Sequence, residues 1–95
     1  MNTVFVLIAQ FGPRAIIPIG EVCKEYFPHL STNKLLEKIG TGDIALPLVR
    51  IEKSLQAAKG VYVQDLAEYI DARRAAAVKE RNQLCGLDWT KGPLF

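Results

Sequence analysis

The feature that most constrains this sequence is a short amphipathic segment enclosed by two prolines, Pro18 and Pro28. Proline suits the first turn of a helix, and it ends a helix that reaches it because its ring clashes with the preceding turn. Between the prolines, apolar side chains recur at the spacing that places them on one helix face. They are Ile19, Val22, Cys23, Tyr26 and Phe27. The sequence therefore predicts a helix that begins after Pro18 and ends before Pro28.

A second helix is predicted after a tight turn, from Ser31 to about Ile39. The Ser31 hydroxyl can accept a hydrogen bond from the free amides of a helix N-terminus, and Gly40 suits a left-handed C-terminal cap. Leu35, Leu36 and Ile39 form its core stripe, whereas Thr32, Asn33, Lys34, Glu37 and Lys38 face outward. Two short helices joined by a tight turn are typical of a helix-turn-helix, whose second helix lies in the DNA major groove.

A β-hairpin is predicted next in the chain. The segment 46–51 contains Pro47 and β-favouring residues and indicates a short edge strand. A polar loop over 52–60 leads to a second β-prone segment, 61–63. A hairpin after a helix-turn-helix is a wing, and its cations commonly lie beside the minor groove or the phosphate backbone. The cations of this hairpin are Arg50, Lys53 and Lys59, although a solvated loop would also carry lysines.

The last regular element is predicted as the longest helix, beginning near Asp65. Its far half is basic, and we expect those charges to be solvated or to lie at an interface rather than to contact bases; they are Arg73, Arg74, Lys79 and Arg81. The segment 3–11 permits a strand or a helix, and we favour a short helix. Its apolar surface is too large for a free arm, so residues 1–12 are expected in the core or in a dimer interface.

These elements predict a mainly α fold with a small β-hairpin wing, a winged helix-turn-helix. Since 95 residues can bury only one core, we expect a single domain over 1–85. The irregular tail 86–95 contains Trp89 and Phe95, which are expected to pack on the domain or a partner. A hydrophobic content of 49% with 23% charged residues is typical of a folded domain.

Composition and motifs also exclude several classes. A net charge of +2 is far below that of a nonspecific nucleic-acid coat protein. The apolar run 4–9 is shorter than the roughly 17–25 residues of a membrane span, and no basic residue precedes Arg14 as in a secretory signal, so a cytoplasmic protein is expected. Cys23 and Cys85 match no metal-binding spacing, and Cys23 is expected to be buried and reduced.

Catalysis is not expected either. His29, the single histidine, stands in a predicted turn with no evident nucleophile beside it. The glycines do not form a phosphate-binding loop, because no Gly-Lys-Ser/Thr sequence precedes a helix. We therefore expect no enzyme activity, no metal and no cofactor.

Several short motifs are spread along most of the chain. They are Asn2-Thr3-Val4-Phe5, Ala9-Gln10, Ile17-Pro18, Tyr26-Phe27, Leu46-Pro47, Arg50 and the segment Asp65-Leu66-Ala67-Glu68-Tyr69-Ile70-Asp71. Over residues 1–81 the chain resembles the pyocin activator (PrtN-like) family. The resemblance implies a bacterial or prophage-encoded transcriptional activator that binds upstream of bacteriocin or phage-derived genes. The order of elements is also similar to excisionase and MerR-like winged domains, so an architectural DNA-binding role stays open.

The expected partner is double-stranded DNA. Ser31 and Thr32 would reach phosphate at a helix N-terminus, and Asn33, Lys34 and Lys38 could meet base edges. Arg50, Lys53 and Lys59 would hold the backbone, whereas Glu37 would repel phosphate unless it accepts from cytosine or orients a lysine.

Other partners are also expected. One small module buries only about 600–1,000 Å² on DNA, so we expect a homodimer, with RNA polymerase as a further partner. The rival of another class is a module that binds polymerase or a host regulator without touching DNA; Glu37 and the modest net charge favour it.

Overall fold

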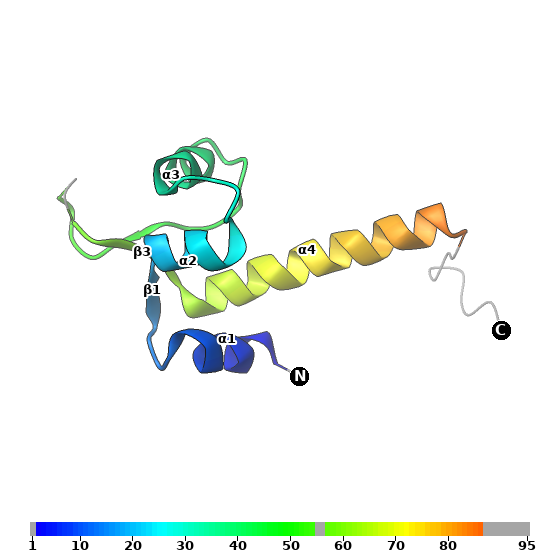
Figure 1. The fold of residues 1–95 in the computed structure, drawn as a ribbon, viewed down its shortest axis with the longest axis horizontal. Coiled ribbons are helices and arrows are strands. Elements are labelled where there is room, and N and C mark those ends of the chain that lie inside the picture. Colours follow the sequence, from blue (N-terminus) through cyan, green and yellow to red (C-terminus); the bar gives the residue numbers. More distant parts are fainter. Residues whose placement is uncertain (1, 55–56, 87–95) are drawn as a thin grey trace.

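The computed structural model describes residues 2–54 and 57–86, which form a mainly helical protein with one small antiparallel sheet. The elements follow in the order α1 (Thr3–Phe11), β1 (Ile16–Pro18), α2 (Ile19–Tyr26), α3 (Thr32–Gly40), β2 (Val49–Arg50), β3 (Lys59–Tyr62) and α4 (Val63–Leu84). In Figure 1, α3 lies at the top and α1 at the bottom, with α2, the sheet and the start of α4 between them. The prediction of a mainly α fold with a small β component is confirmed.

The sheet has the strand order β1-β3-β2, with β3 antiparallel to both neighbours. Strand β1 was not predicted, because three residues ending in a proline show no periodicity. Its pairing depends on Gly60, where a Cβ atom would lie 2.6 Å from the carbonyl oxygen of Ile17. Only a residue without a side chain lets the two strands approach this closely. β1 thus connects the α1 side of the molecule to the β2–β3 hairpin.

One hydrophobic core joins all the helices. Its buried members are Leu7, Phe11, Ile17, Ile19, Val22, Cys23, Phe27, Leu35, Ile44, Leu46, Val61, Leu66 and Ala67. The described residues contribute no buried polar or charged side chain to it. Cys23 is buried and unpaired, as predicted.

The segment 3–11 is a helix, as the sequence analysis favoured. The Asn2 side chain accepts a hydrogen bond from the Val4 amide at 2.8 Å, which supplies a partner for a free amide of the first turn. α1 buries Leu7 and Phe11 and packs on α4, where the Thr3 hydroxyl donates to Asp71 at 2.6 Å. The segment is therefore part of the folded domain.

Polar contacts also connect α1 to α2. The Arg14 guanidinium donates to the carbonyl oxygen of Phe11 and forms an ion pair with Glu21, with an N···O distance of 2.6 Å. The hydrogen bond from Arg14 lowers the pKa of Glu21, and the same bond raises the pKa of Arg14. The Tyr26 hydroxyl donates to Gln10, and burial raises the pKa of Tyr26.

Two predicted boundaries need correction. Gly40 is the last residue of α3 rather than a left-handed cap, and the glycine with a positive φ that follows this helix is Gly42, at +84°. The helix runs further than predicted because its last carbonyl groups bind the amides of Thr41 and Gly42. The strand predicted over 46–51 is confined to β2, because only Val49 and Arg50 pair with β3.

Helix α4 begins at Val63 and has 22 residues, which gives it a length of about 33 Å. Its buried residues, Leu66 and Ala67, lie in the first turns. From Asp71 to the end of the helix, every residue is exposed except half-buried Val78 and Asn82. The far half of α4 therefore projects from the domain, as Figure 1 shows. The predictions for Trp89 and Phe95 fall outside the described residues.

Candidate nucleic-acid interface

The turn between α2 and α3 is held by several hydrogen bonds. The Cys23 thiol donates to the carbonyl oxygens of Leu30, at 3.2 Å, and Phe27. The Ser31 hydroxyl accepts a hydrogen bond from the Lys34 amide at 3.1 Å, so the predicted cap is confirmed. Leu35 anchors the helix in the core with 0% of its surface exposed. The orientation of α3 is thus determined by its inner face.

The outward face of α3 carries the polar residues predicted to contact DNA. Asn33 and Lys34 are exposed, and Thr32 is half-buried. Lys34 Nζ lies 3.5 Å from Glu37 Oε1, with both side chains more than half exposed. Exposed ion pairs contribute little stability, so Lys34 can exchange Glu37 for another anion at small cost. Glu37 therefore has a lysine neighbour, which is the arrangement in which it would orient a lysine.

The two ends of α3 differ in the groups they offer. At the first turn, Ser31 is exposed, and the amides that have no partner within the helix can donate to an anion. At the last turn, Lys38 is half-buried, and its carbonyl oxygen accepts from the Ile44 amide at 3.1 Å. The N-terminal half of α3 is therefore the better placed half for contact with a ligand.

The β2–β3 hairpin carries the second group of predicted residues. Arg50 faces Lys59 across the paired strands, and the Ile51 amide donates to the Ala58 carbonyl oxygen at 3.1 Å. Lys59 was predicted in the loop, but it begins β3 and is half-buried. The loop between the strands is shorter than predicted because pairing extends back to this residue.

A hollow of about 440 Å³ opens on the hairpin. Its lining includes two of the predicted cations, Arg50 and Lys53, together with Leu48, Ile51 and Glu52. Its charged side chains are exposed, and they are two cations and one carboxylate, that of Glu52. A hollow of this kind suits an anionic surface better than an enclosed small molecule.

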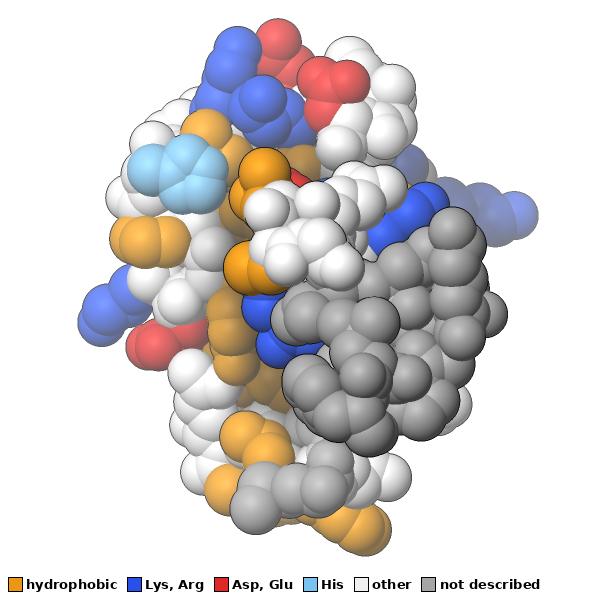
Figure 2. Space-filling view, turned by 90° about the vertical axis from the view of Figure 1, so that its right-hand side faces the viewer, with side chains coloured by type: hydrophobic (Ala, Val, Ile, Leu, Met, Phe, Trp, Pro, Cys, Tyr) orange, Lys and Arg blue, Asp and Glu red, His pale blue; other side chains and the backbone are white. Residues whose placement is uncertain are grey.

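The structure brings the predicted residues together in two groups, one on α3 and one on the hairpin. In Figure 1 the hairpin extends to the left of α3. Figure 2 shows Lys, Arg, Asp and Glu side chains at the α3 end of the molecule and at mid-height, whereas hydrophobic side chains are seen at the opposite end, where α1 lies. The predicted residues thus lie on α3 and the hairpin, away from α1.

Within the described part of the chain, no group of three His, Cys, Asp or Glu residues could hold a metal ion. In residues 2–54 and 57–86, the structure also has no helix of the length and apolar character needed to cross a lipid bilayer.

The fold and the candidate interface define a small helical protein whose exposed polar helix stands beside a basic hairpin. The family model described as "Pyocin activator protein PrtN" matches residues 3–77. This match covers every strand and helix from α1 into α4, and the chain belongs to the pyocin activator family. Comparison with curated proteins found no match, and comparison with solved structures found none.

Proposed function

We propose that this protein is a winged helix-turn-helix regulator that binds double-stranded DNA and activates the transcription of pyocin or prophage genes in the bacterial cytoplasm. Membership of the pyocin activator family supports the regulatory role. The main observation in support of DNA binding is the exposed face of α3. Ser31 caps this helix, and a hairpin with Arg50 and Lys59 lies beside it. In this proposal α2 and α3 are the helix-turn-helix, and the β2–β3 hairpin is the wing.

Helix α3 would enter the major groove with its N-terminal half. The Ser31 hydroxyl, Thr32 and the free amides of the first turn would donate to a phosphate. Asn33 and Lys34 would reach base edges, because both are exposed on the outer face. Lys38, which is half-buried, would reach only the edge of the groove.

The wing would hold the DNA backbone. Arg50 and Lys59 lie opposite each other on paired strands, which keeps their backbones at a defined separation. Lys53 extends the basic surface into the connecting loop. These contacts position the protein without reading sequence, since phosphates are the same at every base pair.

The opposite side of the molecule suits protein contacts. α1 contains no charged residue, and it exposes 69% of Phe5 and 43% of Val6. An uncharged apolar surface of this kind supports the proposal that the protein forms a homodimer through α1 and places two copies of α3 on the DNA. RNA polymerase is a further partner of the proposed activator.

The proposal is tested by titrating the purified chain onto its own upstream DNA and onto a scrambled duplex at several salt concentrations. We expect preferential binding to the upstream duplex, with log K falling against log salt by about 0.9 per phosphate contact. Folded protein that binds neither duplex at low salt would refute DNA binding and favour a module that contacts polymerase or a host regulator.

Two substitutions test the site assignment. Lys34→Ala and Arg50→Ala each remove an exposed cation, so both should weaken DNA binding without unfolding the domain. Arg81→Ala is the matched control, because Arg81 is an exposed cation near the far end of α4, remote from α3. If both variants bind as tightly as the wild type, the assignment is wrong.

A further inference from the structure

The cation Arg73 lies where α4 leaves the domain, and it was not among the residues predicted to contact DNA. We propose that Arg73 binds the DNA backbone on the side of α3 opposite the wing, so that the duplex is held at the wing, at α3 and at α4. This inference rests on the proposed DNA-binding function and extends it to an element outside the helix-turn-helix and the wing.

Two contacts define the sides of α4 near Arg73. The Tyr69 ring lies 6.1 Å from the ring of Phe27, which follows the last residue of α2 and begins the turn to α3. Asp71 instead accepts a hydrogen bond from Thr3 of α1. Residues three or four positions apart share a helix face, so Arg73 continues the Tyr69 side and Arg74 continues the Asp71 side. Arg73 therefore faces the α2–α3 turn, and Arg74 lies about 100° away, toward α1.

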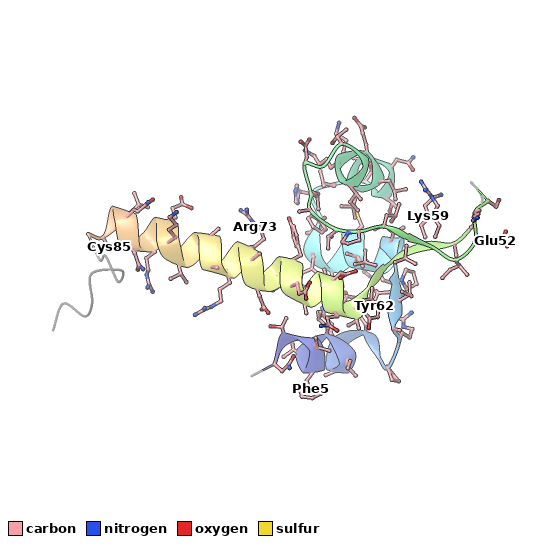
Figure 3. All side chains as sticks on the ribbon, turned by 180° about the vertical axis from the view of Figure 1, so that it is seen from behind. Phe5, Glu52, Lys59, Tyr62, Arg73 and Cys85 are labelled. Carbon is pink, nitrogen blue, oxygen red and sulfur yellow. The ribbon has the colours of Figure 1, made fainter. Side chains whose placement is uncertain are left out.

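The placement of the labelled side chains agrees with this assignment. In Figure 3, Arg73 extends from α4 and Lys59 from β3, both toward the side of the molecule on which α3 lies. The two cations stand on opposite sides of α3, and α3 rises above the elements that carry them. A helix that occupies a major groove is bordered by a phosphate backbone on each side. The wing accounts for one border, and Arg73 is placed for the other.

The charge of Arg73 is not neutralised by a neighbouring residue of α4. The residues three and four positions away are Tyr69, Ile70, Ala76 and Ala77, none of which is acidic. The side chain is exposed, and within residues 2–54 and 57–86 it forms no ion pair or hydrogen bond. By contrast, Lys34 on α3 is paired with Glu37.

The chemistry of the side chain also fits a phosphate. Guanidinium groups bind phosphate oxygens through two parallel hydrogen bonds. A cation with no carboxylate neighbour contributes its full charge to such a contact, which matters in a chain whose net charge is only +2.

The test compares full-length Arg73→Ala and Arg74→Ala in the salt titration on the upstream duplex. For Arg73→Ala we expect the slope of log K against log salt to fall by about 0.9, the value of one phosphate contact. We also expect affinity to fall by a similar factor on the upstream and scrambled duplexes, because a backbone contact reads no sequence. Arg74→Ala should keep the wild-type slope, and Arg73→Lys should retain most of it since the charge remains.

A phosphate-ethylation interference experiment locates the contact. Arg73→Ala should lose interference at a phosphate on one side of the α3 site, and Arg50→Ala at phosphates on the other side. Equal slopes for wild type and Arg73→Ala would overturn the inference while leaving the proposed function intact. Equal losses for Arg73→Ala and Arg74→Ala would also overturn it, because they would indicate a general charge effect. Absence of DNA binding by the wild type would overturn both proposals.

Discussion

Helices α1 and α3 are alike in their local construction and opposite in their outer surfaces. Each has nine residues, and each begins at a short polar side chain that accepts a hydrogen bond from a backbone amide, Asn2 in α1 and Ser31 in α3. Each also buries a leucine almost completely, with 1% of Leu7 and 0% of Leu35 exposed. The outer face of α1 is apolar and uncharged, whereas that of α3 carries amide, cationic and anionic groups.

Capping and inner-face packing thus form both helices without deciding what the outer face of each contacts. Inner faces of both helices serve the same core. Outer faces are free of that constraint, and they differ: that of α3 is polar and charged, and that of α1 is apolar. Substitutions at the inner face should therefore affect both helices alike, and substitutions at the outer face should separate them.

The largest expected effect is at the buried leucines. Leu7→Asp and Leu35→Asp should each abolish cooperative folding, because burying an unpaired carboxylate costs several kcal/mol out of a typical stability of about 5–15 kcal/mol. Circular dichroism during thermal denaturation checks both variants. Ala9→Asp and Asn33→Asp place the same residue at exposed positions of the two helices and should fold. A folded Leu7→Asp variant would show that α1 is not needed for the core, which would contradict the similarity between α1 and α3.

The helix caps come next in size. Asn2→Ala and Ser31→Ala should each lower the free energy of unfolding by about 1 kcal/mol, since each leaves a first-turn amide without its partner. Urea denaturation measures this loss. Only Ser31→Ala should also weaken DNA binding, because only that hydroxyl lies at the proposed phosphate site. Equal DNA affinities for the two variants would count against a phosphate at the α3 N-terminus.

A smaller effect on stability is expected at the exposed face of α1. Phe5→Ser removes a ring that is 69% exposed, so the free energy of unfolding should change by less than about 0.5 kcal/mol. Self-association, measured by sedimentation equilibrium, should weaken, whereas Lys34→Ala should leave it unchanged. A wild-type chain that is monomeric on DNA at micromolar concentration would contradict the dimer proposal.

The smallest effect is a pH dependence at the Arg14–Glu21 ion pair. The hydrogen bond from Arg14 holds the pKa of Glu21 below its ordinary value of 4.5, so its contribution is present above that pH and is lost as the pH falls through the lowered pKa. Both groups are exposed, which makes the contribution small. Glu21→Gln should therefore lower the thermal midpoint slightly at pH 7, and this difference should shrink as the pH falls below 4.5. A difference that grows toward low pH would contradict this assignment.

Much of the helical framework was accessible to prediction because its signals are local. Pro18 and Pro28 enclose α2, and Ser31 marks the start of α3 one residue before its first helical position. The helix at 3–11 was harder to predict, because its β-branched residues permit a strand and its choice depends on packing against α4.

The candidate interface was predicted as a set of residues but not as an arrangement. The pairing of Lys34 with Glu37 follows from their spacing of three residues on a helix. The position of Lys59 in β3 depends on which residue lies across from it, and that residue is Arg50, nine positions earlier. The orientation of Arg73 could have been anticipated only by knowing that Tyr69, one turn before it, contacts Phe27.

The sequence by itself determined α2 and α3 and the inward faces of these two helices, because caps, prolines and apolar periodicity act within one or two turns. Helix α1 depended also on its packing against α4. The tertiary structure alone decided the third strand, since β1 has no pattern of its own and exists where Gly60 lets Ile17 approach β3. It also decided which charges share a side of the molecule, because α3, the hairpin and α4 are placed by core contacts between residues distant in sequence.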